Sequence, residues 1–370
     1  MRNRRQFVKA VVGATAGIFA TGNRFVDSVA RGAAEPQAAA PAQTAQTARR
    51  EVRVGGKRVK VVDVHAHATV PEVADIVKGT PLERNAGGGG RALGADRIAE
   101  MDKRGIDVQA LDINAFWWYA AADRDLATKI VQVQDEGLAA WCKAHPDRFV
   151  AFTSPALQFP DLAAQQLDHA VKNLGMRGAA IGGHVAGVSL SDPKFDPFWA
   201  KAQELGVLVF MHPGGAENVI KMGGLEGKGD LGNIIGNPLE TTLFFSQLIF
   251  NGTLDKFPGL KICGAHGGGY LPSYRGRTEV ACDVRANAKC VNKKKPDEYF
   301  HQQLLVDSMV FSPEGVRHLV AELGPSQVVY GTDIPLVWPD TIDAILGAQI
   351  PDAQKEAVLG GNLIKLLKIS

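Results

Sequence analysis

The chain has 370 residues, of which 45% are hydrophobic, 22% are charged and 41 are glycine. This composition is that of a globular chain with a large core, so it excludes a wholly disordered protein and a collagen-like repeat. The net charge is +2, but residues 1–50 hold eight Arg or Lys and two acids, or +6, which leaves −4 for residues 51–370. A nucleic-acid partner is therefore not expected. The length allows two domains or one large α/β barrel with insertions.

The first residues have the pattern of an export signal. The charged segment MRNRRQFVK precedes an uncharged apolar stretch at 10–21, and Ser28-Val29-Ala30 offers small residues to a signal peptidase. The paired arginines, with Phe7 and Lys9, resemble a twin-arginine signal, which implies a periplasmic or otherwise exported protein. The alternative is an N-terminal amphipathic helix. After this leader, no apolar run reaches the roughly 18 to 20 residues of a membrane helix.

We expect three segments along the chain. A signal peptide occupies residues 1–30, and a disordered linker follows at 31–58, because residues 31–50 are mostly Ala, Gln, Pro and Thr. Residues 59–370 form the folded domain.

In this domain, short β-branched runs alternate with segments of helical period, which favours β/α units. The runs with the pattern of strands are 59–67, 109–114, 148–155, 177–182, 208–212, 261–266, 304–307 and 327–333. Helices are expected at 123–145, 161–174, 197–205 and 313–323, each with Asp or Pro near its start. Eight such repeats predict a (β/α)8 TIM barrel with insertions. The alternative, a doubly wound sheet, would need a glycine-rich phosphate turn after its first strand, and no G-x-G-x-x-G follows there.

Histidines close three of the predicted strands. His65 and His67 end the first, His212 the fifth and His266 the sixth, and Asp333 ends the eighth. In a barrel these strand ends converge, and the spacing of two places both imidazoles of H-x-H on one face. A lone H-x-H could equally be a surface or core pair. Three histidines and a carboxylate at equivalent strand ends instead predict a site for Zn2+ or another divalent ion, with room for a water.

Several motifs are those of a known family: VDVHAH at 62–67, MHP at 211–213, GAHGGG at 264–269, GTD at 331–333 and GGN at 360–362. They resemble the amidohydrolase superfamily, and more narrowly its aminocarboxymuconate semialdehyde decarboxylase-like branch. The resemblance covers nearly all of 59–369. It implies a distorted (β/α)8 barrel whose single catalytic metal is held by four ligands, with a fifth residue, His266, as the acid/base. The implied ligands are His65, His67, His212 and Asp333.

Physical reasoning from the residues agrees with these roles. A metal with an open position lowers the pKa of its bound water to about 7. His266 precedes three glycines that let a substrate approach, so it could take and return the proton, although it could instead only support the ligands. Binuclear superfamily members bridge their metals with a lysine on the fourth strand, and the run 177–182 has none. We therefore expect one metal, Zn2+ ahead of Mn2+, and no organic cofactor.

Three residues are candidates for substrate contacts. Arg277 matches a family arginine that holds a carboxylate and reaches a neighbouring subunit, which implies a homodimer, but it could also be a helix-surface charge. A second family arginine corresponds to Arg84 or Arg91. Trp117 could stack on a flat substrate or pack in the core, and His184 could line the pocket or face solvent in a loop.

These features predict a metal-dependent carboxy-lyase that removes CO2 non-oxidatively from a small unsaturated or aromatic carboxylate. The alternative is hydrolysis of a lactone, ester or amide by the same metal-bound hydroxide. A catalytically inactive metal-binding barrel is a third hypothesis. The four cysteines contain no C-x-x-C pair, so a thiolate zinc site is not expected, while Cys282 and Cys290 could pair in an oxidising compartment.

Overall fold

The structure is a computed structural model that describes residues 49–86, 90–119, 121–215 and 224–370. The predicted signal peptide and most of the predicted linker lie outside these residues. The end of the linker differs from the expectation, because β1 (Arg53–Val54) and β2 (Lys57–Arg58) form an antiparallel hairpin. Val52 and Val54 are buried in the core. These two valines alternate with charged residues, a strand pattern too short to stand out in the sequence.

All eight predicted strands are present, and most are shorter than predicted. They are β3 (Val62–Thr69), β5 (Val108–Asp112), β6 (Phe149–Ala151), β7 (Gly178–Ile181), β10 (Leu208–Met211), β11 (Lys261–Gly264), β12 (Leu304–Asp307) and β13 (Val328–Val329). Nearly every residue in them is buried, as expected for parallel strands covered by helices.

The eight strands form a closed ring. Within two sheets, the neighbours β3-β5-β6 and β7-β10-β11-β12-β13 pair in parallel. Thr153, just after β6, bridges to Ala179 of β7, and Ala66 of β3 bridges to Ile334, beyond β13. The second junction also contains a hydrogen bond of 2.7 Å from the His67 N–H to the Ile334 carbonyl. The predicted (β/α)8 barrel is therefore confirmed.

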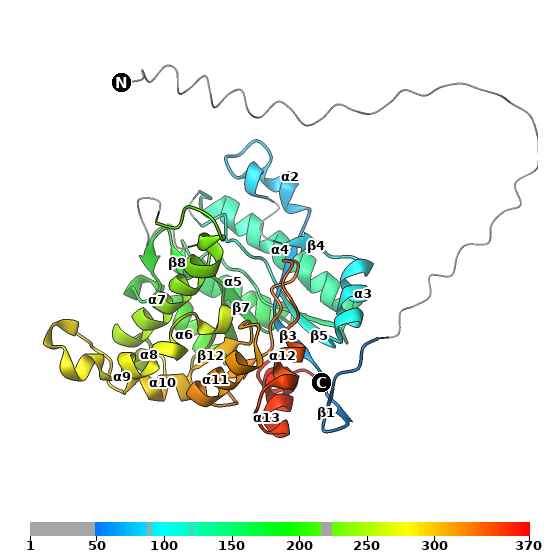
Figure 1. The fold of residues 1–370 in the computed structure, drawn as a ribbon. Coiled ribbons are helices and arrows are strands. Elements are labelled where there is room, and N and C mark those ends of the chain that lie inside the picture. The colour runs from blue at the N-terminus through cyan, green and yellow to red at the C-terminus, as the bar shows by residue number, and fades with distance from the viewer. Residues whose placement is uncertain (1–48, 87–89, 120, 216–223) are drawn as a thin grey trace, which may run out of the picture. The chain divides into compact units, whose positions relative to one another are not determined.

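Helices cover the outside of the barrel (Figure 1). The four predicted helices correspond to α4 (Arg124–Ala144), α5 (Pro160–Asn173), α6 (Asp196–Leu205) and α11 (Pro313–Leu323), and others include α3 (Ala95–Arg104) and α7 (Asn237–Phe250). Side chains before two of them accept backbone N–H groups of the first turn: Asp123 for α4 and Ser312 for α11. None of the helices in the described segments is long and apolar enough to cross a membrane.

The inside of the barrel is filled with apolar side chains. Val62, Val64 and Phe210 belong to a buried cluster that also includes Leu363 and Leu367, at and just after α14 (Asn362–Leu366). The interior is thus a packed core and not a channel. The side chains of the candidate site lie at the other end of this core, toward the carboxyl ends of the strands.

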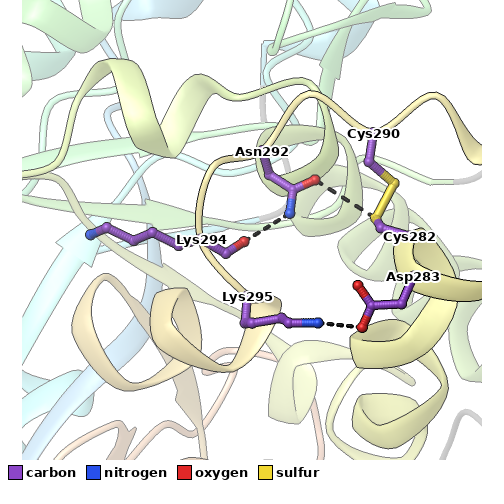
Figure 2. Close-up of a disulfide and its surroundings, with 6 residues drawn as sticks. All are labelled: Cys282, Asp283, Cys290, Asn292, Lys294 and Lys295. Carbon is purple, nitrogen blue, oxygen red and sulfur yellow. Dashed lines mark hydrogen bonds and ion pairs between the residues drawn. A yellow bond between two sulfur atoms is a disulfide. The ribbon is translucent and has the colours of Figure 1, made fainter.

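A disulfide joins Cys282 and Cys290 (Figure 2). It ties α9 (Arg275–Val284) to the segment that follows, where Lys295 also pairs with Asp283. No residue of α9 is buried. The pairing that the sequence left open is therefore present, and it restrains a helix that has little packing of its own.

Candidate metal centre

Five polar side chains converge at the carboxyl ends of the strands. They are His65 and His67 of β3, His212 after β10, His266 after β11 and Asp333 beyond β13. The Nε2 atoms of His65 and His67 are 3.2 Å apart. Four of the five residues offer ligand atoms that all lie within 4.8 Å of one another, one atom from each residue. These four are His65, His212, His266 and Asp333. The structure thus brings together every residue that the sequence placed at the metal and its acid/base.

Asp333 lies at the middle of this cluster. Its Oδ1 is 3.0 Å from the Nε2 of His65 and of His67, and 3.7 Å from that of His212, while its Oδ2 is 3.7 Å from His266 Nε2. Burial opposes its ionisation, but the surrounding imidazoles, His65 foremost, hold the pKa of Asp333 well below its usual range. The carboxylate is therefore charged and available as an anionic ligand.

Each of the three predicted imidazole ligands is held through its other nitrogen. His65 Nδ1 is 2.7 Å from Asp307 Oδ2, and His67 Nδ1 is 2.6 Å from Asp112 Oδ1. His212 Nδ1 donates to the carbonyl of Pro213 at 2.8 Å. These contacts leave each Nε2 directed at the centre, which is the arrangement that metal-ligating histidines have in proteins.

The electrostatics of the imidazoles also fit a cation site. Burial lowers the pKa of His65, but Asp333 and Asp307 outweigh it and raise that pKa to about 10. For His212 burial dominates, and its pKa lies well below the ordinary value. Its Nε2 is buried and has no hydrogen-bond partner among the described residues. A neutral imidazole with an unpartnered nitrogen, beside a charged carboxylate, is a donor set suited to a divalent ion.

The backbone is strained at two of these residues. His266 and Asp333 have φ values of 57° and 60°, in the left-handed region. This conformation costs a non-glycine residue about 1 kcal/mol or more, and such outliers cluster at functional sites. After His266 the glycines are required, because a Cβ on Gly269 would lie 2.2 Å from the carbonyl oxygen of Pro238. The turn after β11 is therefore built to present the His266 side chain.

The three predicted substrate contacts do not join this cluster. His184 begins the short strand β8 (His184–Val185), and its Nδ1 accepts the Gly187 N–H at 3.2 Å. Trp117, after β5, is half-buried and packs edge-on against Trp118, with ring centroids 5.2 Å apart. Arg277 is exposed on α9 and makes no hydrogen bond or ion pair with the described residues.

The sequence analysis missed carboxylates that support the site. Asp112 and Asp307 each end a strand, as Asp333 follows one, so this shared position was the available signal. Glu240, in the first turn of α7, is a further carboxylate that the sequence analysis did not include. Glu240 is buried, and its Oε1 accepts the N–H groups of Gly183 at 3.0 Å and Gly214 at 3.1 Å. It thereby holds the loops after β7 and β10 against α7.

Residues 62–369 match the amidohydrolase family over most of the chain. The chain belongs to this family. The amidohydrolase is 32% identical over 278 residues to the 2-amino-3-carboxymuconate-6-semialdehyde decarboxylase of Dictyostelium discoideum, an alignment that covers 73% of this chain and 75% of the relative. It is 28% identical over 286 residues to the gamma-resorcylate decarboxylase of a Polaromonas species, covering 74% of this chain and 87% of the relative.

The fold is also shared with a solved decarboxylase. The 5-carboxyvanillate decarboxylase of Novosphingobium aromaticivorans, complexed with manganese and 4-hydroxy-3-methoxy-5-nitrobenzoic acid, matches this amidohydrolase with a TM-score of 0.72 and 23% identity. The match covers 86% of this chain and 99% of the other. The likeness agrees with the barrel derived from strand pairing above.

Proposed function

We propose that this amidohydrolase is a metal-dependent carboxy-lyase that removes CO2 non-oxidatively from a small aromatic or unsaturated carboxylate. The observation that carries the proposal is the convergence of the three predicted imidazole ligands on the Asp333 carboxylate, each imidazole being held through its second nitrogen. The two relatives named above, both decarboxylases, support carbon–carbon cleavage over hydrolysis as the reaction at this site.

One divalent ion would be held by His65, His67, His212 and Asp333. Three nitrogens and one carboxylate oxygen suit Zn2+, and Mn2+ is the alternative because the similar 5-carboxyvanillate decarboxylase contains it. When bound, the ion supplies a Lewis acid that orients and polarises the oxygen groups of the substrate.

His266 is the group that moves the proton. Its side chain is 15% exposed and so is reachable from the mouth, whereas the side chain of His65 is fully buried. It would deliver a proton to the carbon that bears the carboxylate. The bond from that carbon to the carboxylate then breaks, its electron pair restores the ring or double bond, and CO2 leaves. Asp333, with Oδ2 at 3.7 Å, orients the imidazole during this transfer.

The substrate carboxylate requires a cationic partner, for which Arg277 is the candidate. Because Arg277 is exposed on α9, it would act across the interface of a homodimer. Val280 and Val284 of α9 support such an interface, since they are 48% and 70% exposed and present apolar surface that a second subunit would cover. His184 and Trp117 would approach the substrate from the loops after β7 and β5.

We propose that the protein is periplasmic or otherwise exported. The twin-arginine pattern of residues 1–9 is one support, and the disulfide between Cys282 and Cys290 is another, because such bonds persist in oxidising compartments.

A mass-spectrometric screen tests the reaction. The purified, metal-loaded protein is offered hydroxybenzoates, unsaturated carboxylates, lactones, esters and amides, and a chelator-treated sample serves as the control. Metal-dependent loss of CO2 is the expected result. Metal-dependent gain of water would instead establish the hydrolase alternative.

A further inference from the structure

A buried polar network lies beside the strands and segments that carry the site. It consists of Asp63 on β3, Gln109 on β5, Thr332 beyond β13 and Arg97 on α3, none of them more than 3% exposed. The proposed chemistry uses none of these side chains. Burying four polar side chains costs folding free energy unless they are hydrogen-bonded. Their arrangement is therefore expected to serve a function.

The network begins where β3 departs from regular pairing. Asp63 lies opposite Gln109 and Ala66 opposite Leu111, so β3 has one residue more than β5 in this interval, which is a β-bulge. The N–H of His65 falls inside the bulge and donates to Asp63 Oδ1 at 3.0 Å. Bulges re-aim side chains next to active sites. Here the re-aimed residue is the first imidazole of the centre.

Asp63 also ties β3 to the segment that carries Asp333. The N–H of Thr332 donates to Asp63 Oδ1 at 3.1 Å, and the Thr332 hydroxyl donates to Asp63 Oδ2 at 2.7 Å. The backbone adds a further bond between the same two segments, because the N–H of Asp333 donates to the His65 carbonyl at 2.8 Å. The strand with two imidazoles and the segment with the carboxylate are thus joined by side-chain and backbone bonds together.

Gln109 and Arg97 complete the network and reach the second imidazole. Gln109 Nε2 donates to Asp63 Oδ2 at 2.8 Å, and its Oε1 accepts from Arg97 Nη1 at 3.3 Å. Arg97 Nη2 donates to the His67 carbonyl at 2.5 Å. Arg97 thereby links Asp63, through Gln109, to the backbone of the second imidazole.

We propose that Asp63, Gln109, Thr332 and Arg97 are positioning residues that set the separation between the β3 imidazoles and the Asp333 carboxylate, and thereby the affinity for the divalent ion. The inference rests on the proposed function. Its physical reason is that a ligand set binds tightly only when its geometry is held within a fraction of an ångström by the groups behind it.

The test compares two buried glutamines, one inside the network and one outside it. Gln109→Leu removes the amide between Asp63 and Arg97. Gln303→Leu is the matched control, because Gln303 is also buried and donates to two carbonyls, those of Leu254 and Phe257, but precedes β12 at the opposite end of the barrel. For each variant, Zn2+ and Mn2+ dissociation constants are measured by competition with a chromophoric chelator, and the unfolding free energy of the metal-free protein is measured in urea.

We expect both substitutions to lower stability, but only Gln109→Leu to weaken metal binding, by about tenfold or more. Equal effects of the two substitutions on affinity, or wild-type affinity in Gln109→Leu, would overturn the inference and leave the proposed function intact. Failure of the wild-type protein to bind either ion would overturn both.

A second pair of variants decides the question if Gln109→Leu does not fold. Thr332→Val keeps the shape of the side chain and removes the hydroxyl that donates to Asp63. Thr332→Ser keeps the hydroxyl. Loss of affinity in the valine variant with recovery in the serine variant supports positioning through Asp63, whereas equal affinity in both overturns it.

Discussion

His266 differs from the other imidazoles of the centre in being the most exposed, at 15% of its side chain. It can also be grouped with His65, His212 and Asp333 as a ligand, in place of His67. If it is the acid/base, His266→Asn should keep the metal and lower kcat by about 10²- to 10⁴-fold, which is the usual contribution of a positioned proton donor. Metal content and kcat of the same preparation check this. Loss of the ion in His266→Asn would instead make His266 a ligand.

Asp135 on α4 makes stability depend on pH. Burial raises its pKa to about 8, although the Thr153 hydroxyl, which donates to Oδ2 at 2.7 Å, acts in the opposite direction. The folded protein then keeps this proton up to about pH 8, while the unfolded chain releases it above its ordinary pKa of 3.8. Stability is therefore lost as pH rises through this window, by up to about 1.4 kcal/mol per pH unit.

Asp135→Asn should remove this loss. The variant is expected to gain unfolding free energy relative to the wild type steadily from pH 5 to pH 8, measured by urea denaturation at each pH. A difference that does not change with pH would contradict the assignment.

At the residue scale, the sequence identified the groups that face the centre and missed those behind them. His65, His67, His212 and Asp333 could be found because strand ends meet in a barrel, which is a rule of the fold. Asp63 could not be found in this way. Its role depends on a bulge in β3 and on Thr332, which is 269 residues away in the chain, and neither follows from local pattern.

At the scale of elements, the strands were predicted because alternation of β-branched runs and helical segments is a strong signal. Their bounds were less accurate, since a strand ends where its partner ends; β13, for example, is only Val328–Val329 of the predicted 327–333. The conformation of α9 and its disulfide depends on contacts outside the helix, because α9 buries none of its own residues.

The disulfide should stabilise this element locally. A loop of this length, with Cys282 and Cys290 eight positions apart, contributes about 2 to 3 kcal/mol in the chain-entropy model. In the double variant Cys282→Ser, Cys290→Ser, we expect trypsin to cleave faster after the exposed residues Arg285 and Lys289. Mass spectrometry of the fragments over time measures the cleavage rate. Metal affinity should not change, and a parallel loss of metal would contradict a local role.

At the scale of the whole molecule, the ligands come from both sides of the junction that closes the ring, since β3 meets the segment beyond β13 there. An ion that binds only the closed barrel stabilises it by mass action, by about 2.7 kcal/mol at a free concentration of 100 Kd. Thermal unfolding should therefore shift upward with Zn2+ or Mn2+ and return with chelator. His212→Ala is the control, and an equal shift in that variant would place the stabilising ion elsewhere.

The closing junction has a consequence for biosynthesis. His67 and Asp333 are 266 residues apart, so nearly the whole domain must leave the ribosome before one ion can contact both. A chain truncated before β13 keeps two imidazoles of H-x-H but lacks the carboxylate between them. An ion bound by the full ligand set would thus be present only in chains whose translation and folding are complete. Under the proposed twin-arginine export, which carries folded proteins, loading in the cytoplasm would serve as quality control before export.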